Sequence, residues 1–424
     1  MDGLPVVIVG AGPAGLAAAA HLVGRGIDPL VLEAGAAPAA AVREWGHVRL
    51  FSPWGELVDT AAEKLLAPTG WTAPAPDTYP SSAEWARDHL QPLAAALGDR
   101  VRVDAEVVGV ARRGWDRVAD GGRATEPLTV RLASGGRITA RAVIDASGTW
   151  TNPNPLGGDG LPALGEEAAA DRVTYRVPDL ADPEVRARYA GRRTAVAGSG
   201  HSALTALAEL AALAEEEPGT RVTWLLRRGE VGNAFGGGAA DQLPARGALG
   251  QRAARAVAAG HVTTVPSFRT AAVLRVDSRL VLESFDGARV GPVDEVLALT
   301  GFRPDLSMHA EVRLDLDPVL QAPRALAPLI DPNVHSCGTV YPHGAAELAQ
   351  PEPGVYLVGM KSYGRAPTYL SLIGYEQVRS VVAEIAGDRA AAGRVELVLP
   401  ETGVCGGSGL AAEPATTAAA GCCG

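Results

Sequence analysis

A glycine-rich turn close to the amino terminus constrains the fold more than any other feature of the sequence. The apolar run "PVVIV" (residues 5–9) is followed by "GAGPAG" and then by an alanine-rich helical pattern. Gly10, Gly12 and Gly15 have the spacing of a dinucleotide fingerprint: a tight turn, room for a pyrophosphate, and close packing of helix on strand. The next apolar strand ends in Glu33, whose carboxylate can accept hydrogen bonds from a ribose. We therefore predict a βαβ dinucleotide site, the alternative being a glycine-rich turn without a ligand.

The same order of strand, turn, helix and strand returns about 190 residues later, which makes a weak internal repeat. In "TAVAGSGHSA" the three fingerprint positions are taken by Gly198, Gly200 and Ala203. After the second strand of this unit, Arg227 and Arg228 stand where the first unit has a carboxylate. Guanidinium groups supply the charge and the forked donors that a ribose 2′-phosphate requires. The sequence thus predicts NADPH rather than NADH, the alternative being a solvated arginine pair at a strand end.

Two segments mark where the chain passes between domains. "DASGTW", which contains Gly148, and "LTGFRPD" each follow an apolar strand and break into glycine or proline. A later strand, "GVYLVGM", contains Gly359 and precedes a helical pattern. We expect an α/β fold of two doubly wound Rossmann-like domains, the second inserted into the first. The predicted boundaries are 1–155 and 306–390 for the first domain, 190–305 for the second, and 401–424 for a flexible cysteine-containing tail.

Composition excludes several classes of protein. The chain has 424 residues, a formal net charge of -10, and lysine only at Lys64 and Lys361. No basic surface for nucleic acid or an anionic membrane is therefore expected. The apolar run at residues 4–22 contains glycines and a proline and has no basic residue before it, so we predict neither a signal peptide nor a membrane span. These observations favour a cytoplasmic protein. The irregularly spaced "HSCGTVYPHGAAE" is interpreted as loop packing, and no metal site is predicted.

The first βαβ unit ends in a carboxylate and the second ends in arginines. In this order the chain resembles the two-dinucleotide-binding-domain flavoproteins, over about residues 5–390. The resemblance implies that FAD occupies the first domain and NADPH the inserted one. It also implies that the two crossovers pass the flavin and that the strand with Gly359 returns to the FAD domain. The helix start near Pro367 and Thr368 is expected to face the flavin pyrimidine edge, where the helix dipole would stabilise the anionic reduced ring.

Cysteine positions separate the branches of this family. Disulfide reductases of this fold carry a redox-active cysteine pair beside the flavin, whereas residues 34–190 and the second glycine unit contain no cysteine. The chain is thus more similar to flavin-containing monooxygenases, in which NADPH reduces FAD and dioxygen forms a C4a-hydroperoxyflavin that oxygenates a small soft nucleophile at nitrogen, sulfur or a trivalent metalloid. Their His-centred signature before the second glycine turn is absent here. The resemblance makes Arg49, Ser52 and Trp54 expected pocket residues, with core packing as the alternative.

The terminal "GCCG" supports a second hypothesis. Cys422 and Cys423 resemble the terminal pairs of large thioredoxin reductases and of mercuric reductases, which pass electrons outward or capture a soft metal. Together with Cys405 they are suited to a thiophilic ion such as arsenite. The alternatives are therefore a reductase that delivers electrons to this dithiol, a flavin-bearing redox sensor, or a flexible end without function. The sequence identifies neither the substrate nor the oligomeric state.

Overall fold

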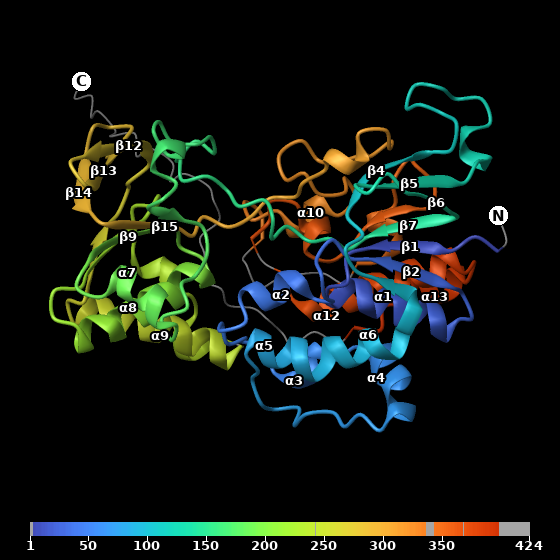
Figure 1. Cartoon of the computed structure of the whole chain (residues 1–424), viewed down its shortest axis with the longest axis horizontal. Coiled ribbons are helices and arrows are strands. Elements are labelled where there is room, and N and C mark those ends of the chain that lie inside the picture. Colours follow the sequence, from blue (N-terminus) through green and yellow to red (C-terminus); the bar gives the residue numbers. More distant parts are fainter. Residues whose placement is uncertain (1–2, 242, 336–342, 368, 398–424) are drawn as a thin grey trace, which may run out of the picture.

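The two glycine turns lie in two separate α/β domains, placed side by side along the long axis of the molecule (Figure 1). The computed structural model describes residues 3–241, 243–335, 343–367 and 369–397. The amino-terminal turn belongs to one domain, which the chain leaves and later re-enters. The second turn belongs to the domain built in between, as the repeat in the sequence predicts.

The first domain is built on a five-stranded parallel sheet. Its strands are, in spatial order, β16 (Val355–Leu357), β7 (Ala142–Asp145), β1 (Val6–Val9), β2 (Pro29–Leu32) and β3 (Val101–Arg102). Side chains alternate between its two faces, as the period of a strand requires. Val6 and Ile8 of β1 pack towards the helices, while Val7 packs towards an antiparallel sheet. That second layer consists of β4 (Val107–Arg112), β5 (Leu128–Leu132) and β6 (Arg137–Ala140).

Helices cover the other face of this sheet (Figure 1). The two longest are α1 (Pro13–Gly24) and α12 (Ser371–Ile385), which pack on each other. The shorter ones are α2 (Ala40–Glu44), α3 (Trp54–Leu57), α4 (Thr60–Leu66), α5 (Ser82–Trp85), α6 (Gln91–Leu97), α10 (Ala327–Ile330), α11 (Ala345–Leu348) and α13 (Arg389–Gly393).

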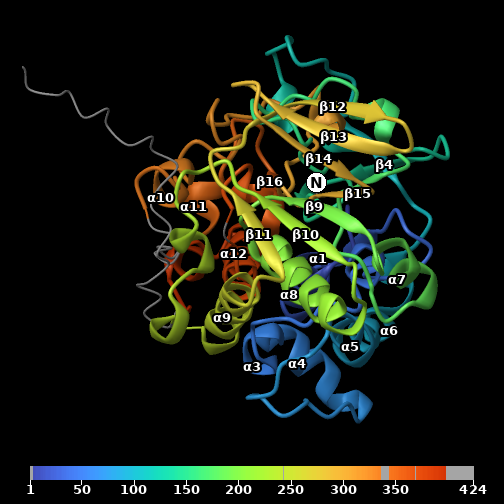
Figure 2. The ribbon, with the colours of Figure 1, turned by 90° about the vertical axis from the view of Figure 1, so that its left-hand side faces the viewer.

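The second domain repeats the design with a different outer layer. Its parallel sheet has the order β11 (Val262–Val265), β10 (Arg221–Leu225), β9 (Arg193–Ala197), β15 (Glu295–Ala298) and β8 (Val173–Thr174). Helices α8 (His201–Glu216) and α9 (Pro244–Ala258) pack on one face, and α7 (Pro183–Tyr189) lies beside them. The antiparallel strands β12 (Thr270–Val276), β13 (Arg279–Ser284) and β14 (Arg289–Val293) cover the other face (Figure 2).

The two crossovers run antiparallel to each other between the domains. The backbone N–H of Asn154 donates to Gly301 O at 2.9 Å, and that of Arg303 donates to Asn152 O at 3.0 Å. The side chain of Asn154 also donates to Thr300 O at 3.0 Å. The connection between the domains is thus a hydrogen-bonded pair of strands. Residues 156–189, which the predicted boundaries leave between the domains, pack into the second one through the core that contains Leu156.

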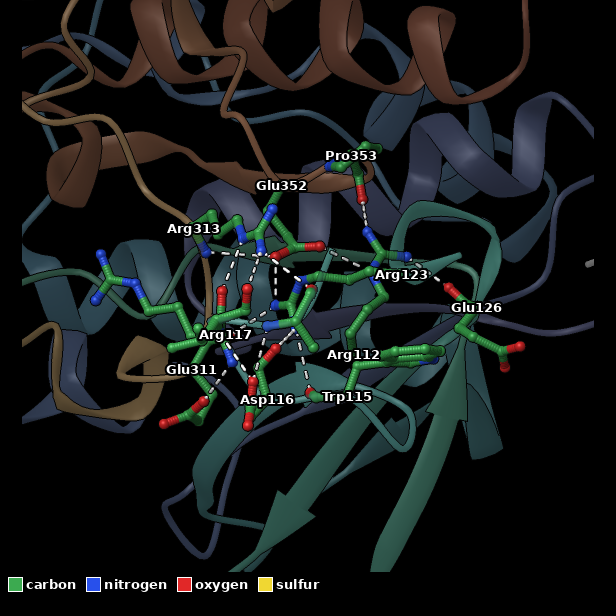
Figure 3. Close-up of polar contacts among 12 residues, drawn as sticks. Arg112, Trp115, Asp116, Arg117, Arg123, Glu126, Glu311, Arg313, Glu352 and Pro353 are labelled. Carbon is green, nitrogen blue, oxygen red and sulfur yellow. Dashed lines mark hydrogen bonds and ion pairs between the residues drawn. The ribbon is translucent and has the colours of Figure 1, made fainter. Parts of the chain in front are cut away.

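A buried ion cluster fastens three distant parts of the first domain together (Figure 3). Glu352 accepts from Arg112 Nε at 2.8 Å and from Arg123 Nη2 at 2.7 Å, and all three side chains are at most 3% exposed. Arg123 also donates to the carbonyl oxygens of Asp116 and Glu311. The loop between β4 and β5 is thereby tied to the returning segment. None of these side chains lines the cavity between the domains, so the cluster has a structural role.

Candidate functional site

A cavity of about 1600 Å³ extends between the two domains and reaches both glycine turns. Gly10, Gly12 and Glu33 line it on the side of the first domain, and His201 and Ser202 line it on the side of the second. Sites for drug-sized ligands usually enclose about 300–1,000 Å³. The cavity therefore has room for a large cofactor together with a second ligand.

The three glycines of the first turn are required for three different reasons. Gly10 has φ +96°, and a Cβ there would meet Ala146 O at 3.0 Å. A Cβ on Gly15 would stand 2.0 Å from Gly10 O, so only glycine lets helix α1 approach the strand this closely. A Cβ on Gly12 would meet open space. Gly12 is the N-cap of α1 and no side chain caps this helix, which leaves its first N–H groups to a ligand.

Glu33 directly follows β2 and is held by the glycine turn itself. Its Oε2 accepts from Ala11 N at 2.8 Å and its Oε1 accepts from Gly35 N at 2.9 Å. Each carboxylate oxygen has about two acceptor sites, so one site per oxygen is left for ribose hydroxyls. Glu33 directly follows β2, as expected from the sequence, and its role as an acceptor for ribose hydroxyls stays a prediction.

The second turn has the same construction. Gly198 has φ +126°, and a Cβ there would lie 2.1 Å from Leu299 O. Gly200 faces open space and is the N-cap of α8, again without a side-chain cap. Ala203 is fully buried where α8 packs on the sheet. His201 opens the helix with its ring 4.8 Å from that of Phe51 in the first domain, so the two domains touch at this turn. Burial, with the nearby charge of Arg246, lowers the pKa of His201 to about 4, which leaves it neutral near pH 7.

Three arginines gather beyond the end of β10. Arg227 and Arg228 follow this strand, as the sequence indicates, and the loop before β12 brings Arg269 beside them. The backbone bond from Phe268 N to Leu226 O, at 2.9 Å, fixes that loop. Burial lowers the pKa of Arg227, and the charges of Arg228 and Arg269 lower it further. Within the described part of the chain none of the three guanidinium groups has an acidic partner.

This group, the arginine trio of Arg227, Arg228 and Arg269, has the chemistry of a site for a phosphate. It lies outside the lining of the interdomain cavity. Arg269 was not predicted from the sequence, because it follows Arg228 by about 40 residues and only the tertiary pairing of two loops brings them together.

Aromatic side chains from both crossovers form the wall of the cavity beside the paired crossover segments. The ring of Trp150 lies 5.1 Å from that of Phe302 and 6.2 Å from that of Trp45, between ring centroids. The guanidinium carbon of Arg176 stands 3.8 Å above the centre of the Trp150 ring, a cation–π contact. Glu44 accepts from Trp150 Nε1 at 2.7 Å. Trp150 and Phe302 occur in the two crossovers expected from the sequence, but no local pattern marks these side chains as parts of one wall.

The expected pocket residues of the first domain divide into two groups. Arg49 and Ser52 line the cavity, and Arg49 donates to the carbonyl oxygen of Tyr79. Trp54 is 5% exposed, belongs to the core of the first domain, and does not line the cavity. Its place corresponds to the core-packing alternative. Phe51, which sequence analysis did not name, lines the cavity instead.

The structure corrects the expected start of the last long helix. Helix α12 begins at Ser371, whereas Pro367 precedes it and is exposed, and Thr368 lies outside the described residues. A Cβ on Gly374 would lie 1.8 Å from the Tyr369 hydroxyl, so that side chain lies across the first turn of the helix. The chain therefore enters α12 with Leu370 in an extended conformation. The side chains of residues 369–371 line the cavity at this place, as do Gly148 and Gly359.

A buried group of charges stands in the floor of the cavity, at the carboxyl ends of β7 and β16. Lys361 Nζ lies 2.8 Å from Asp145 Oδ2 and 2.8 Å from Ser147 Oγ. His309 Nε2 lies 2.7 Å from the same carboxylate oxygen. Burial alone would raise the pKa of Asp145, but the Lys361 ammonium and the His309 hydrogen bond hold it well below its usual range. Asp145 is therefore a carboxylate at every working pH.

The thiol hypothesis concerns parts of the chain that the structure does not describe. Cys422 and Cys423, like Cys337 and Cys405, lie outside the described residues. Among the described residues there is no group of three His, Cys, Asp or Glu side chains able to hold a metal ion, and no helix there has the length and apolar character needed to cross a membrane.

Comparisons with known proteins agree with this site. A family model described as pyridine nucleotide-disulphide oxidoreductase matches residues 7–323. A bacillithiol disulfide reductase from Bacillus cereus is similar in structure, with a TM-score of 0.64 and 20% identity over 91% of this chain and 99% of that one. A flavin-containing monooxygenase from Stenotrophomonas maltophilia has a TM-score of 0.55 and 25% identity over 91% and 100%.

A Lactococcus lactis thioredoxin reductase has a TM-score of 0.56 and 16% identity over 90% of this chain and 99% of that one. No curated protein sequence matches the chain. The family match, the two glycine turns and the doubly wound domains agree on two cofactors, FAD and a nicotinamide nucleotide. This chain therefore belongs to the pyridine nucleotide-disulphide oxidoreductase family and is an FAD-dependent oxidoreductase of pyridine nucleotides.

Proposed function

We propose that this protein is an NADPH-dependent flavin monooxygenase that oxygenates a small soft nucleophile at sulfur, nitrogen or a trivalent metalloid. The observation that carries the proposal is the interdomain cavity, which reaches both nucleotide turns and has aromatic walls, together with the absence of any cysteine from residues 1–336 of the sequence. A disulfide reductase of this fold would need a cysteine pair at that place. The similarity to the Stenotrophomonas maltophilia monooxygenase, over nearly the full length of both chains, supports the same conclusion.

The choice of NADPH rests on the arginine trio. A 2′-phosphate carries up to two negative charges, and NADH has only a hydroxyl at that position. Within the described residues these three cations have no acidic partner, so they repel one another. Burial lowers the pKa of Arg227, and the charges of Arg228 and Arg269 lower it further. A bound phosphate would relieve that repulsion, so the second domain favours the phosphorylated dinucleotide.

FAD, when bound, supplies the acceptor for the hydride of NADPH and the electrons that activate dioxygen. The residues of this chain bind and orient the reactants. The first turn and Glu33 hold the dinucleotide of the flavin, and the neutral His201 and Ser202 open the helix that receives the nicotinamide nucleotide. Trp45, Trp150 and Phe302 give the space between the domains an apolar wall.

The overall reaction balances as NADPH, a proton, dioxygen and the nucleophile giving NADP⁺, water and the oxygenated nucleophile. The test is to follow NADPH, dioxygen and hydrogen peroxide together while a thioether, a tertiary amine or arsenite is added. A monooxygenase should consume equal amounts of NADPH and dioxygen, and its substrate should lower peroxide release while an oxygenated product accumulates. Equal peroxide release with every nucleophile would count against the proposal.

A second candidate function is kept because Cys422 and Cys423 are adjacent in the sequence. In this alternative, electrons from FAD pass to a disulfide or a thiophilic ion at the terminal dithiol. The variant C422S/C423S separates the two. A monooxygenase should retain its NADPH-driven oxygen consumption in this variant, whereas a tail-dependent reductase should lose anaerobic disulfide or metalloid reduction and keep the transfer of hydride to FAD.

A further inference from the structure

The strand order of the first domain gives a direction to the bound flavin nucleotide. From one side of the sheet to the other, the carboxyl ends belong to β2, β1, β7 and β16. Glu33 at the end of β2 is suited to the adenosine ribose, and Gly12 after β1 is suited to the pyrophosphate. The remaining half of the nucleotide, with the ribityl chain and the flavin ring, must therefore extend over the ends of β7 and β16.

Lys361 is the buried cation at that place. Its side chain is 1% exposed, yet it belongs to the lining of the cavity, as do Ser147 and Gly359. The chain has only one other lysine, Lys64, and that one is exposed. Burial of an ammonium group is costly unless every N–H has a partner. A lysine in the wall of a ligand cavity therefore calls for a ligand or a complete set of partners.

The Lys361 ammonium has one hydrogen-bond partner fewer than it has donors. An ammonium has three N–H donors. Among the described residues two are used, by Asp145 Oδ2 and by Ser147 Oγ, each at 2.8 Å. The third is left for a group that enters the cavity from the side of the sheet ends.

Asp145 is fully occupied by protein groups and is not available to a ligand. Its Oδ1 accepts from Ser147 N at 3.0 Å and from Ser147 Oγ at 2.7 Å, and its Oδ2 accepts from Lys361 and from His309. These are about all the acceptor sites that a carboxylate has. His309 must carry its hydrogen on Nε2, because the carboxylate has none to donate, and its buried Nδ1 has no partner in the described structure. Asp145 and His309 therefore fix the place of the ammonium.

We propose that Lys361, held by Asp145 and His309, donates its third N–H to an oxygen of the ribityl–phosphate half of FAD and is a positioning residue for this cofactor. The ion group then has a reason to be buried in the cavity wall. Its role differs from that of the Arg112–Glu352–Arg123 cluster, which is equally buried but does not line the interdomain cavity.

The test is a fluorescence titration of the FAD-stripped, full-length protein with FAD and, in parallel, with AMP, which is the adenosine half of FAD with its own phosphate only. The variant Lys361→Met should weaken FAD binding about tenfold to a hundredfold, the loss of one hydrogen bond to a charged donor. Its affinity for AMP should stay within about twofold, since this ligand lacks the second phosphate, the ribityl chain and the flavin ring. The matched control, Lys64→Met, removes the other lysine of the chain and should change neither affinity.

A purely structural ion pair predicts different outcomes. The Kd of FAD in Lys361→Met would then stay unchanged, or the affinities for FAD and AMP would fall together, and either result overturns the proposal. If Lys361→Met does not fold, Asp145→Asn/Lys361→Met replaces the pair by neutral groups and serves in the same titrations, with circular dichroism as the check on folding. Recovery of the FAD affinity in this double variant would also overturn the proposal, because it still lacks the ammonium. These readouts require no turnover, so a failed monooxygenase assay leaves the test intact.

Discussion

The replacement of Arg227 and Arg228 by alanine tests how the second domain selects its nucleotide. Both side chains are at least partly accessible to solvent, and neither has an acidic partner in the described structure. A hydrogen bond to a charged group contributes about 1.5–3 kcal/mol. Because both groups are partly exposed, we expect this amount for the pair together, which lowers the affinity for NADP⁺ about tenfold to a hundredfold. Arg269→Ala should have a smaller effect in the same direction.

The assay is an equilibrium titration with NADP⁺ and NAD⁺ at two salt concentrations. The affinity for NAD⁺ should stay within about twofold, and the preference for NADP⁺ in the unchanged protein should weaken as salt screens the exposed charges. The matched control is Arg221→Ala, which removes a guanidinium from the other end of β10. This variant should bind both nucleotides normally.

Two results would refute the reasoning. If the affinities for NADP⁺ and NAD⁺ fell by the same factor in Arg227→Ala/Arg228→Ala, the arginines would serve the fold of the strand end and not the 2′-phosphate. If neither affinity changed, the trio would be a solvated cluster, and the preference for NADPH would have to reside elsewhere in the domain.

Three further predictions concern stability. Glu352→Gln removes the negative charge that pairs with two buried arginines and should lower the free energy of unfolding in urea by about 3–5 kcal/mol. The partly exposed Glu283→Gln should lower it by under about 1 kcal/mol, and similar losses in the two variants would contradict the role of the cluster. Burial lowers the pKa of His89 from 6.5 to about 4. As pH falls through this window, the unfolded chain binds a proton before the folded protein does, so the free energy of unfolding decreases by about 3 kcal/mol. In His89→Phe the free energy of unfolding should depend less on pH in this range. The same pH dependence as in the unchanged protein would contradict this prediction. Gly15→Ala should destabilise the protein and abolish FAD binding because its Cβ meets Gly10 O at 2.0 Å, whereas Gly24→Ala in the same helix, with open space at its Cβ, should be tolerated.

Features that depend on local sequence could be predicted. The three glycines, Glu33 and the alternating strands carry their signal within about 30 residues, because a βαβ unit is a local structure. The confirmed α/β fold, with one domain inserted into the other, follows from finding that unit twice. Arg227 and Arg228 could be located for the same reason, since they directly follow a strand of the second unit.

Features that depend on long-range packing could not be predicted from the sequence. Asp145, His309 and Lys361 come from three distant segments and meet only because β7 and β16 are neighbours in the sheet. The direction of the Trp54 side chain depends on the core of the first domain, and the start of α12 depends on how Tyr369 lies across Gly374. No periodicity in one stretch of sequence contains that information.

The central claim is that one cavity brings FAD and a nicotinamide nucleotide together, and an anaerobic titration of the FAD-loaded protein with NADPH tests it most directly. The account predicts one FAD per chain, and loss of the flavin absorbance near 450 nm after about one equivalent of NADPH, since both are two-electron carriers. A protein that binds no FAD, or whose flavin absorbance stays unchanged after excess NADPH and NADH, would contradict the account.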